Sequence, residues 1–354
     1  MAETARKAFI ATLVTIGVVV LALALWKLRL VVALLFAGFI VAAAIRPGID
    51  ALHRRRVPRP VGLTLHYLVL AGLLALALWF AVPRALNQVT SAIENLPETR
   101  RAIGAEAKES SGIKQEILQS LQRLLKEVPS GSTLFTTLKE IGVTAFEVGI
   151  GIFFVFAVAG YWIFEREKAM NIVAELLPGS KRKVVRDTWM LIDLKLGAYV
   201  RGVALIVLIV ATTLSLLFWA IGLPYWLLIG CFAGFVEIVP VIGPLAAAAL
   251  AVGVGLTESV HLAALALVIV VSVRLTQDYV VNPRVMGSAV GMSPLVVLLS
   301  ASAVVFLFGG FAVLLAVPIA AVLVTLVDVV VRDKNPADEE TPTVLFPAAK
   351  EADR

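Results

Sequence analysis

The stretch PYWLLIGCFAGFVEIVPVIGPLAAAALAVGV, from Pro224 to Val254, decides the architecture of this chain. It holds 31 residues with one charged side chain, Glu237, and it reads PVIGP over residues 240–244. A helix that crosses a bilayer needs about 20 apolar residues, so this stretch is too long for one span. Proline lacks the N–H that a helix interior needs, and glycine permits a tight turn. We therefore predict a helical hairpin whose turn lies inside the membrane.

A second overlong apolar stretch follows the same plan. It runs from Pro294 to Val331, holds 38 residues and is interrupted at Gly309-Gly310. As one helix it would be about 57 Å long, against a hydrocarbon core of about 30 Å. Each broken stretch follows a full span, 202–221 or 261–281. Irregular backbone at membrane depth must be buried in protein or line a polar cavity. We therefore predict that the two turns meet near the midplane and enclose a cavity.

The side from which each hairpin enters depends on how many times the chain has crossed the membrane before it. If the first hairpin enters from outside, the polar loop 282–287 with Arg284 lies inside, and the second hairpin enters from the cytoplasm. The two units would then have the inverted-repeat plan of many secondary transporters, with the substrate site at the midplane. Eight complete spans would also leave the C-terminus inside, but would place Arg284 outside. The sequence leaves both arrangements open.

The N-terminal half predicts four further spans, at residues 8–26, 30–45, 61–82 and 141–164. Arginines crowd the short loop after the second span, and such loops are cytoplasmic, so both termini are expected inside. These arginines are Arg46, Arg54, Arg55, Arg56 and Arg59. The fold class expected is an all-α integral protein of the bacterial inner membrane. It would hold about six full transmembrane helices and two re-entrant hairpins, or about eight transmembrane segments.

Composition excludes the main alternative classes. Hydrophobic residues make up 60% and charged residues 16%, whereas soluble domains have about 45–50% and about 25%. The net charge of +6 is not accompanied by a nucleic-acid recognition motif, so no nucleic-acid partner is expected. One cysteine and three scattered histidines predict no metal site, and no catalytic or cofactor motif is present. We expect no cofactor and a transporter rather than an enzyme, driven without ATP.

Composition shifts divide the chain into five predicted parts. They are an N-terminal scaffold (1–83), extracytoplasmic amphipathic helices (84–140), a fourth helix with a cytoplasmic amphipathic linker broken at Pro178-Gly179 (141–201), a transport domain (202–334) and a disordered cytoplasmic tail (335–354).

Several motifs in order resemble one known family. They are Leu223-Pro224, the run EIVPVIGP at 237–244, NPRVMG at 282–287 followed by Gly291 and Pro294, Gly309-Gly310, AVP at 316–318, and upstream Asp193 with YVRG at 199–202. The chain is similar in these motifs to the AI-2E (autoinducer-2 exporter) family over essentially its whole length. The resemblance implies an elevator-like carrier with two hairpins that assembles as a homo-oligomer, a pentamer. Many relatives have Gln near position 203 and His at 293, where this chain has Val203 and Ser293.

Glu237 is the first candidate for the site, because ionisable residues inside a bilayer are costly and usually face a cavity or a partner. It could bind a cation, accept a proton or hydrogen-bond a polyhydroxylated solute. Alternatively it is a structural carboxylate that accepts from the backbone N–H groups of its own turn. Asp278 lies four residues after Arg274 on one helix face, so it either serves the site or pairs only with that arginine.

The remaining candidates would line the cavity or shape its turns. They are Pro240, Gly243, Pro244, Gln277, Asn282, Arg284, Gly309 and Gly310. Two functions fit. The first is export of a small polar solute such as autoinducer-2, a quorum-sensing signal, as the resemblance implies. The alternative is sodium or lithium/proton antiport through Glu237 and Asp278. Expected partners are thus a small polar solute or a monovalent cation or proton, and membrane lipid.

Overall fold

A computed structural model describes residues 2–76, 131–239, 242–285 and 294–339, with single positions 79, 83, 87, 88, 101 and 105 between them. Most of the predicted extracytoplasmic segment 84–140 lies outside the described residues. So do Pro240, Gly287 and the tail from residue 340 onward.

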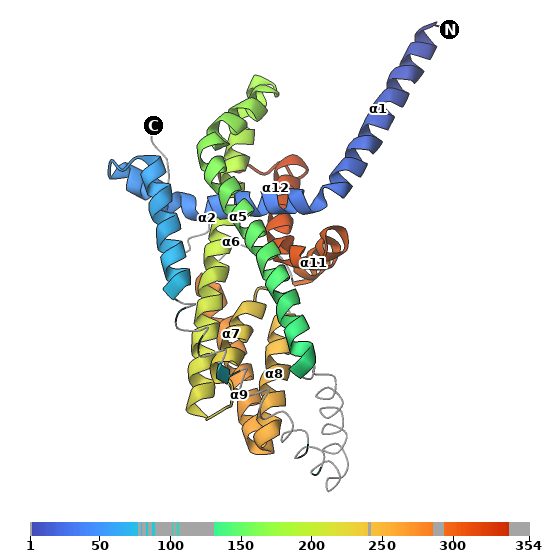
Figure 1. Ribbon diagram of the computed structural model, residues 1–354. Coiled ribbons are helices and arrows are strands. Elements are labelled where there is room, and N and C mark those ends of the chain that lie inside the picture. Colours follow the sequence, from blue (N-terminus) through green and yellow to red (C-terminus); the bar gives the residue numbers. More distant parts are fainter. Residues whose placement is uncertain are drawn as a thin grey trace. The chain divides into compact units, whose positions relative to one another are not determined.

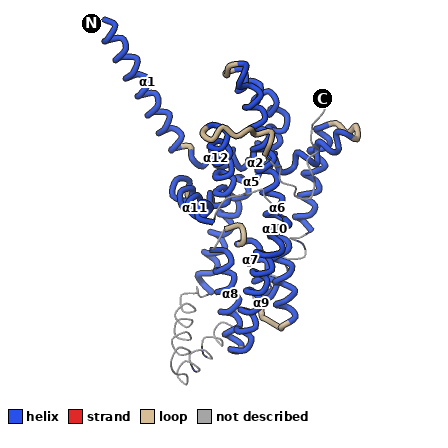
Figure 2. Tube along the Cα trace, turned by 180° about the vertical axis from the view of Figure 1, so that it is seen from behind, coloured by secondary structure: helices blue, strands red, loops and turns tan. Residues whose placement is uncertain are grey.

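The described residues form helices and no strand (Figures 1 and 2). The helices named in Figure 1 begin with α1 (Ala2–Lys27), α2 (Arg29–Arg54), α5 (Gly131–Glu175) and α6 (Gly179–Ala220). They continue with α7 (Trp226–Val236), α8 (Ile242–Glu258), α9 (Val260–Thr276), the π-helix η1 (Gln277–Val281) and α10 (Asn282–Val285). The last are α11 (Pro294–Phe308), the 3-10 helix η3 (Gly310–Leu315) and α12 (Ala316–Val330). The all-α prediction is confirmed.

Six helices of the described part are long and apolar enough to cross a membrane. They are Arg29–Arg54, Arg59–Leu76, Phe146–Glu175, Gly179–Ala220, Val260–Val285 and Ala312–Val330. The first five correspond to predicted spans, whereas the sixth belongs to the second broken stretch. The apolar part of α1, Thr12–Lys27, is shorter than these six. The membrane class is confirmed, and the division between full spans and hairpins stays a prediction.

Helices α5 and α6 are longer than the spans they were expected to contain. The sequence predicted a separate pair of amphipathic helices between residues 165 and 201, broken at Pro178-Gly179. The break is observed, since α5 ends at Glu175 and α6 begins at Gly179. However, the flanking segments continue the spans, because neither helix contains a proline that would end it.

Both overlong apolar stretches are broken where the sequence predicted. Hairpin 1 consists of α7, residues 237–241 and α8; hairpin 2 consists of α11, Gly309, η3 and α12. In each, the two arms pack against one another. Helix α7 has 11 residues and is therefore about 16 Å long, which is too short to cross a hydrocarbon core of about 30 Å. This length favours a re-entrant hairpin 1.

The chain divides into two compact units, which are described separately below. Unit 1 comprises Met1–Ala43, Gly151–Asp193 and Met292–Ala337; unit 2 comprises Ala44–Ile150, Leu194–Gly291 and Asp338–Arg354. Hairpin 1 belongs to unit 2 and hairpin 2 to unit 1.

Unit 1 is held partly by an aromatic stack and a buried ion pair. The rings of Phe39 and Trp162 have centroids 4.2 Å apart, and Trp162 stacks on Trp189 at 6.0 Å. One turn after Trp162, buried Arg166 donates from Nε to the carboxylate of Asp193, joining α5 to α6. These contacts explain why the motif residue Asp193 is needed for packing in this unit.

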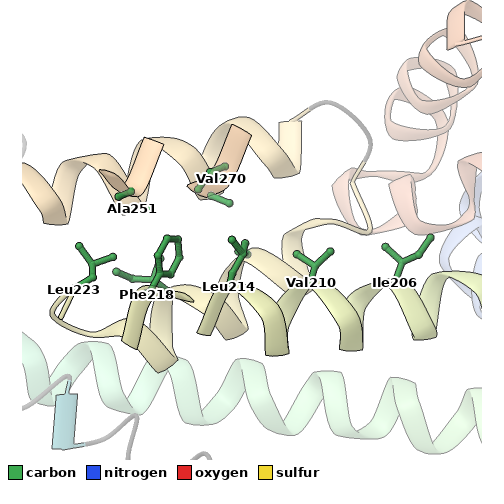
Figure 3. Close-up of a cluster of buried hydrophobic side chains, with 11 residues drawn as sticks. Ile206, Val210, Leu214, Phe218, Leu223, Ala251 and Val270 are labelled. Atoms are coloured by element: carbon green, nitrogen blue, oxygen red, sulfur yellow. The ribbon is translucent and has the colours of Figure 1, made fainter. Parts of the chain in front are cut away.

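The core of unit 2 is formed by one face of α6 and by hairpin 1 with α9. Ile206, Val210, Leu214 and Phe218 recur along α6 and point toward Ala251 of α8 and Val270 of α9 (Figure 3). The helix ends with Gly222 at φ 70°, where Leu223 N donates to Phe218 O at 2.9 Å. Such a glycine cap followed by proline stops a helix. The chain reverses direction at this cap and continues into α7, the first arm of hairpin 1.

Small residues bring hairpin 1 into backbone contact with its neighbours. A Cβ at Gly230 would lie 2.6 Å from Ser215 N, and one at Gly234 would lie 2.7 Å from Val207 O. At the other end, a Cβ at Gly255 would lie 2.7 Å from the Cα of Ala263. Glycines at i and i+4 allow this approach of helix backbones within membranes. Hairpin 1 is therefore fixed closely against α6 and α9.

Candidate functional site

The candidate site is built around the carboxylate of Glu237, at the end of α7. Arg274 Nη1 and Gln277 Nε2 each donate to its Oε1 at 2.7 Å. The Glu237 side chain is 11% exposed. Arg274 lies at the end of α9 and Gln277 at the start of η1, 37 and 40 residues along the chain from Glu237. One interpretation of the sequence was a structural carboxylate that accepts from backbone N–H groups of its own turn. Among the described residues, its donors are instead side chains from a different part of the chain.

Asp278 extends the network on the other side of the guanidinium. Arg274 Nε donates to Asp278 Oδ2 at 2.9 Å, and Asn282 Nδ2 donates to Asp278 Oδ1 at 3.2 Å. The predicted pair of Arg274 and Asp278 is therefore present. It is not exclusive, because the same guanidinium also holds Glu237. We call these five residues, Glu237, Arg274, Gln277, Asp278 and Asn282, the Glu237 network.

A local change of helix type positions this network. Residues Gln277–Val281 form a π-helical turn, in which Asn282 N–H bonds to Gln277 O. π-Helical turns inside α-helices are rare and recur at functional sites. The extra residue in the turn shifts the following side chains relative to α9. Gln277, the first residue of the turn, is buried and faces Glu237, and Asp278 pairs with Arg274 at the usual helical spacing of four residues.

The network retains hydrogen-bonding capacity for a ligand. Both bonds that Glu237 accepts end on Oε1, and no described residue donates to its Oε2. The Oδ1 atom of Asn282 is buried and accepts no hydrogen bond from a described residue. Arg274 and Asp278 are about as exposed as each other, at 37% and 39% of their side chains. Buried acceptors without partners are uncommon and require an explanation.

Gly243 and Pro244 shape the turn next to this network. Gly243 N donates to Val239 O at 3.0 Å, and a Cβ at Gly243 would overlap the backbone oxygen of Val236. Only glycine therefore fits where α8 begins against the end of α7. Pro244 follows in the first turn of α8, where its missing N–H costs no helical hydrogen bond.

Of the other predicted site residues, Arg284 belongs to unit 2, as the network does, whereas Gly309 and Gly310 belong to unit 1. Arg284 lies in α10, is exposed, and forms no ion pair with a described residue. Gly309 has φ 94° and begins η3, so it makes the break in hairpin 2. Gly310 adjoins it in open space. Pro240 lies outside the described residues, and the meeting of the two turns stays a prediction.

Sequence reasoning missed one contact that fixes the start of hairpin 1. The N-cap residue of α7, Tyr225, has φ 57° and no side-chain cap. Instead, Gln88 Oε1 accepts from Leu228 N at 3.1 Å. The first N–H groups of a helix need such acceptors. A glutamine 140 residues away gives no signal in sequence, whereas the Gly230/Gly234 spacing could have indicated the contact with α6.

Comparison with known proteins identifies the family. A family model described as "AI-2E family transporter" matches residues 13–332. The chain belongs to the AI-2E family of transporters. This family member is thus a multi-pass membrane transporter, and the family resemblance seen in its motifs is confirmed.

Curated relatives of this AI-2E family member come from two bacteria. "Putative transport protein YrrI" of Bacillus subtilis (strain 168) is 26% identical over 300 residues, covering 82% of this chain and 83% of the relative. "Putative transport protein YueF" of the same strain is 28% identical over 289 residues, covering 77% of each. "Putative transport protein MT0215" of Mycobacterium tuberculosis (strain CDC 1551 / Oshkosh) is 25% identical over 350 residues, covering 95% of this chain and 93% of the relative.

Proposed function

We propose that this transporter exports a small polar solute, such as autoinducer-2, by binding it at the Glu237 network. The observation that carries the proposal is a half-buried carboxylate at the broken centre of an apolar hairpin, held by side chains of α9 and of the π-helical turn that follows it. Ionisable residues in membrane segments mark transport pathways by default.

The chemistry of the network suits a hydroxyl-rich solute. Gln277, Asn282 and the guanidinium of Arg274 can donate, while Glu237 Oε2 and Asn282 Oδ1 can accept. A polyhydroxylated molecule offers both donors and acceptors at short spacing. It could replace the present side-chain bonds one for one, which limits the free energy lost on desolvation.

A second candidate is sodium or lithium/proton antiport through Glu237 and Asp278. The observation that favours it is the charge of the network, in which two carboxylates share one guanidinium. An uncompensated carboxylate inside a membrane attracts a cation or a proton.

The proposal includes the mechanism expected for paired hairpins. In an elevator-like cycle, hairpins 1 and 2 would enter from opposite faces, and their turns would enclose the solute near the midplane. The N-terminal half would form the static scaffold of a homo-oligomer, a pentamer by family resemblance. The protein would lie in the inner membrane with both termini in the cytoplasm.

Two assays on everted membrane vesicles test which solute moves: uptake of autoinducer-2 into the vesicles, and a sodium-evoked pH change reported by a pH-sensitive dye inside them. In the exporter case, Glu237→Gln should lower transport of autoinducer-2 on the order of tenfold or more, because a charge-assisted hydrogen bond contributes about 1.5–3 kcal/mol and 1.4 kcal/mol is tenfold. A sodium-evoked pH change that Glu237→Gln abolishes would instead establish antiport and exclude the pure exporter.

Two carboxylate variants serve as matched controls. Glu258→Gln changes an exposed acid at the far end of the same hairpin. Asp328→Asn changes a buried acid of α12 that is already paired with Arg332 and Lys334. Both should keep transport near wild type. If either control loses as much activity as Glu237→Gln, the Glu237 network is not the specific site.

A further inference from the structure

The charge of the Glu237 network can be counted residue by residue. Glu237 and Asp278 contribute one negative charge each, and Arg274 contributes one positive charge, so the formal sum is −1. Arginine does not lose its proton in proteins. The guanidinium therefore neutralises one of the two carboxylates, and one negative charge remains for whatever binds.

No other charge in the packed neighbourhood changes this count. Helix α6 packs against hairpin 1, but its charged residues in unit 2 are engaged elsewhere, Lys195 by Glu339 and Arg201 by the backbone oxygen of Ala44. The other elements in contact here are α7, α8, α9, η1 and α10. Besides the three network charges, their residues include Glu258, His261 and Arg284. Glu258 and His261 lie at the opposite end of the α8–α9 pair, and Arg284 has no ion pair with a described residue. The stretches 240–241 and 286–293 contain no charged residue.

We infer that Arg274 limits the site to one positive charge, so that each loaded site holds one monovalent cation or one proton and rejects divalent cations. The inference rests on the second candidate function, cation/proton antiport through the same site. Arg274 is thus a specificity-determining residue: its guanidinium neutralises one of the two carboxylates, so only one further positive charge can be bound.

The physical reason is the cost of net charge in a membrane segment. A loaded network with one monovalent cation or one proton is neutral, whereas a divalent cation would leave it at +1. Uncompensated charge away from water is strongly unfavourable. The guanidinium is also bonded to both carboxylates at 2.7 and 2.9 Å, so a cation must share their oxygens with it. Glu237 Oε2 and Asn282 Oδ1 are two oxygens of the network that accept no hydrogen bond from a described residue.

Equilibrium binding of ⁴⁵Ca²⁺ to the purified full-length protein in detergent tests this charge rule. Wild type should show no saturable binding that depends on Glu237. Arg274→Gln changes the formal charge of the network from −1 to −2 and should create a saturable Ca²⁺ site, with bound Ca²⁺ on the order of tenfold or more above the wild-type background. The double variant Glu237→Gln/Arg274→Gln returns the charge to −1 and should lose that site again.

Two further variants separate charge from loss of packing. Arg274→Lys keeps the positive charge while removing the bidentate fork, and it should bind no Ca²⁺. Arg284→Gln removes a neighbouring arginine that lies outside the network, and it too should bind none. Size-exclusion profiles like that of wild type show that each variant is folded.

Several results would overturn the inference. They are saturable Ca²⁺ binding to wild type that Glu237→Gln removes, a folded Arg274→Gln without Ca²⁺ binding, or an equal gain in Arg274→Lys. If Arg274→Gln does not fold, Ca²⁺ binding to wild type and to Glu237→Gln still tests whether the native site rejects divalent cations. None of these results touches the proposed function, which fails separately if Glu237→Gln leaves transport intact.

Discussion

Hairpin 1 and hairpin 2 solve the same length problem with different chemistry. Both are apolar stretches broken near the middle, and both breaks depend on glycine. The break in hairpin 1 carries Glu237 and three polar partners on α9 and η1. The break in hairpin 2, around Gly309, carries no ionisable residue. A glycine break alone therefore does not form a binding site. In hairpin 1 the polar partners of Glu237 come from α9 and η1.

The acid in each hairpin, half-buried Glu237 and buried Asp328, differs in the same way. Asp328 in α12 uses both oxygens, Oδ1 for Arg332 at 2.8 Å and Oδ2 for Lys334 at 2.9 Å. Its partners lie within six residues on the same chain segment, at 64% and 54% exposure. Glu237 accepts on one oxygen only, from residues distant in sequence. Asp328 therefore closes a helix end, whereas Glu237 keeps capacity for a ligand.

The largest expected difference between the hairpins is the side of the membrane from which each one enters, which cysteine labelling measures. Gly287→Cys in a Cys231→Ser background should be labelled by impermeant maleimide only from the cytoplasmic side, because the parity of the crossings places residues 282–287 inside. Of this predicted polar loop, residues 282–285 form helix α10, which continues the preceding span. The background removes the exposed free cysteine. Gly179→Cys, at the start of α6, is expected in the cytoplasm in either topology and is the positive control. Labelling of position 287 from outside would contradict opposite hairpins and favour eight complete spans.

Replacing the glycine of hairpin 1 should destabilise the protein strongly. In Gly243→Ala the new Cβ would overlap the backbone of Val236, which cannot rotate away. Overpacking of this kind costs about 3 kcal/mol. The midpoint of thermal unfolding in detergent measures it. Gly253→Ala, in the same helix with open space around it, should be neutral or slightly stabilising. Equal midpoints for the two variants would show that the close approach is not required.

Replacing the glycine of hairpin 2 should cost less, for a different reason. Gly309 has open space but φ 94° and ψ 169°, a conformation that L residues rarely adopt. Gly309→Ala should cost about 2 kcal/mol through backbone strain. Gly310→Ala, next to it and without a positive φ, is the control for the same thermal measurement. A larger effect at Gly310 than at Gly309 would contradict this account of the break.

Sequence reasoning predicted the helical architecture well because it depends on local properties. The breaks at 240–244 and 309–310 were visible as proline and glycine within overlong apolar runs, and the observed elements begin and end there. The extent of α5 and α6 was underestimated, because a change from apolar to amphipathic composition does not end a helix without a breaker. The pairing of Arg274 with Asp278 was visible at a spacing of four residues.

The sequence by itself determined the membrane class, the two broken stretches and the presence of Glu237 in one of them, because these follow from hydropathy, length and the chemistry of single residues. The tertiary structure decided how the site is assembled. It turned Arg274 and Gln277 toward Glu237, introduced the π-helical turn after α9, and gave α7 a cap from Gln88. These contacts join residues 37 to 140 positions apart. No local pattern encodes such pairings, since they arise only when separate helices pack together.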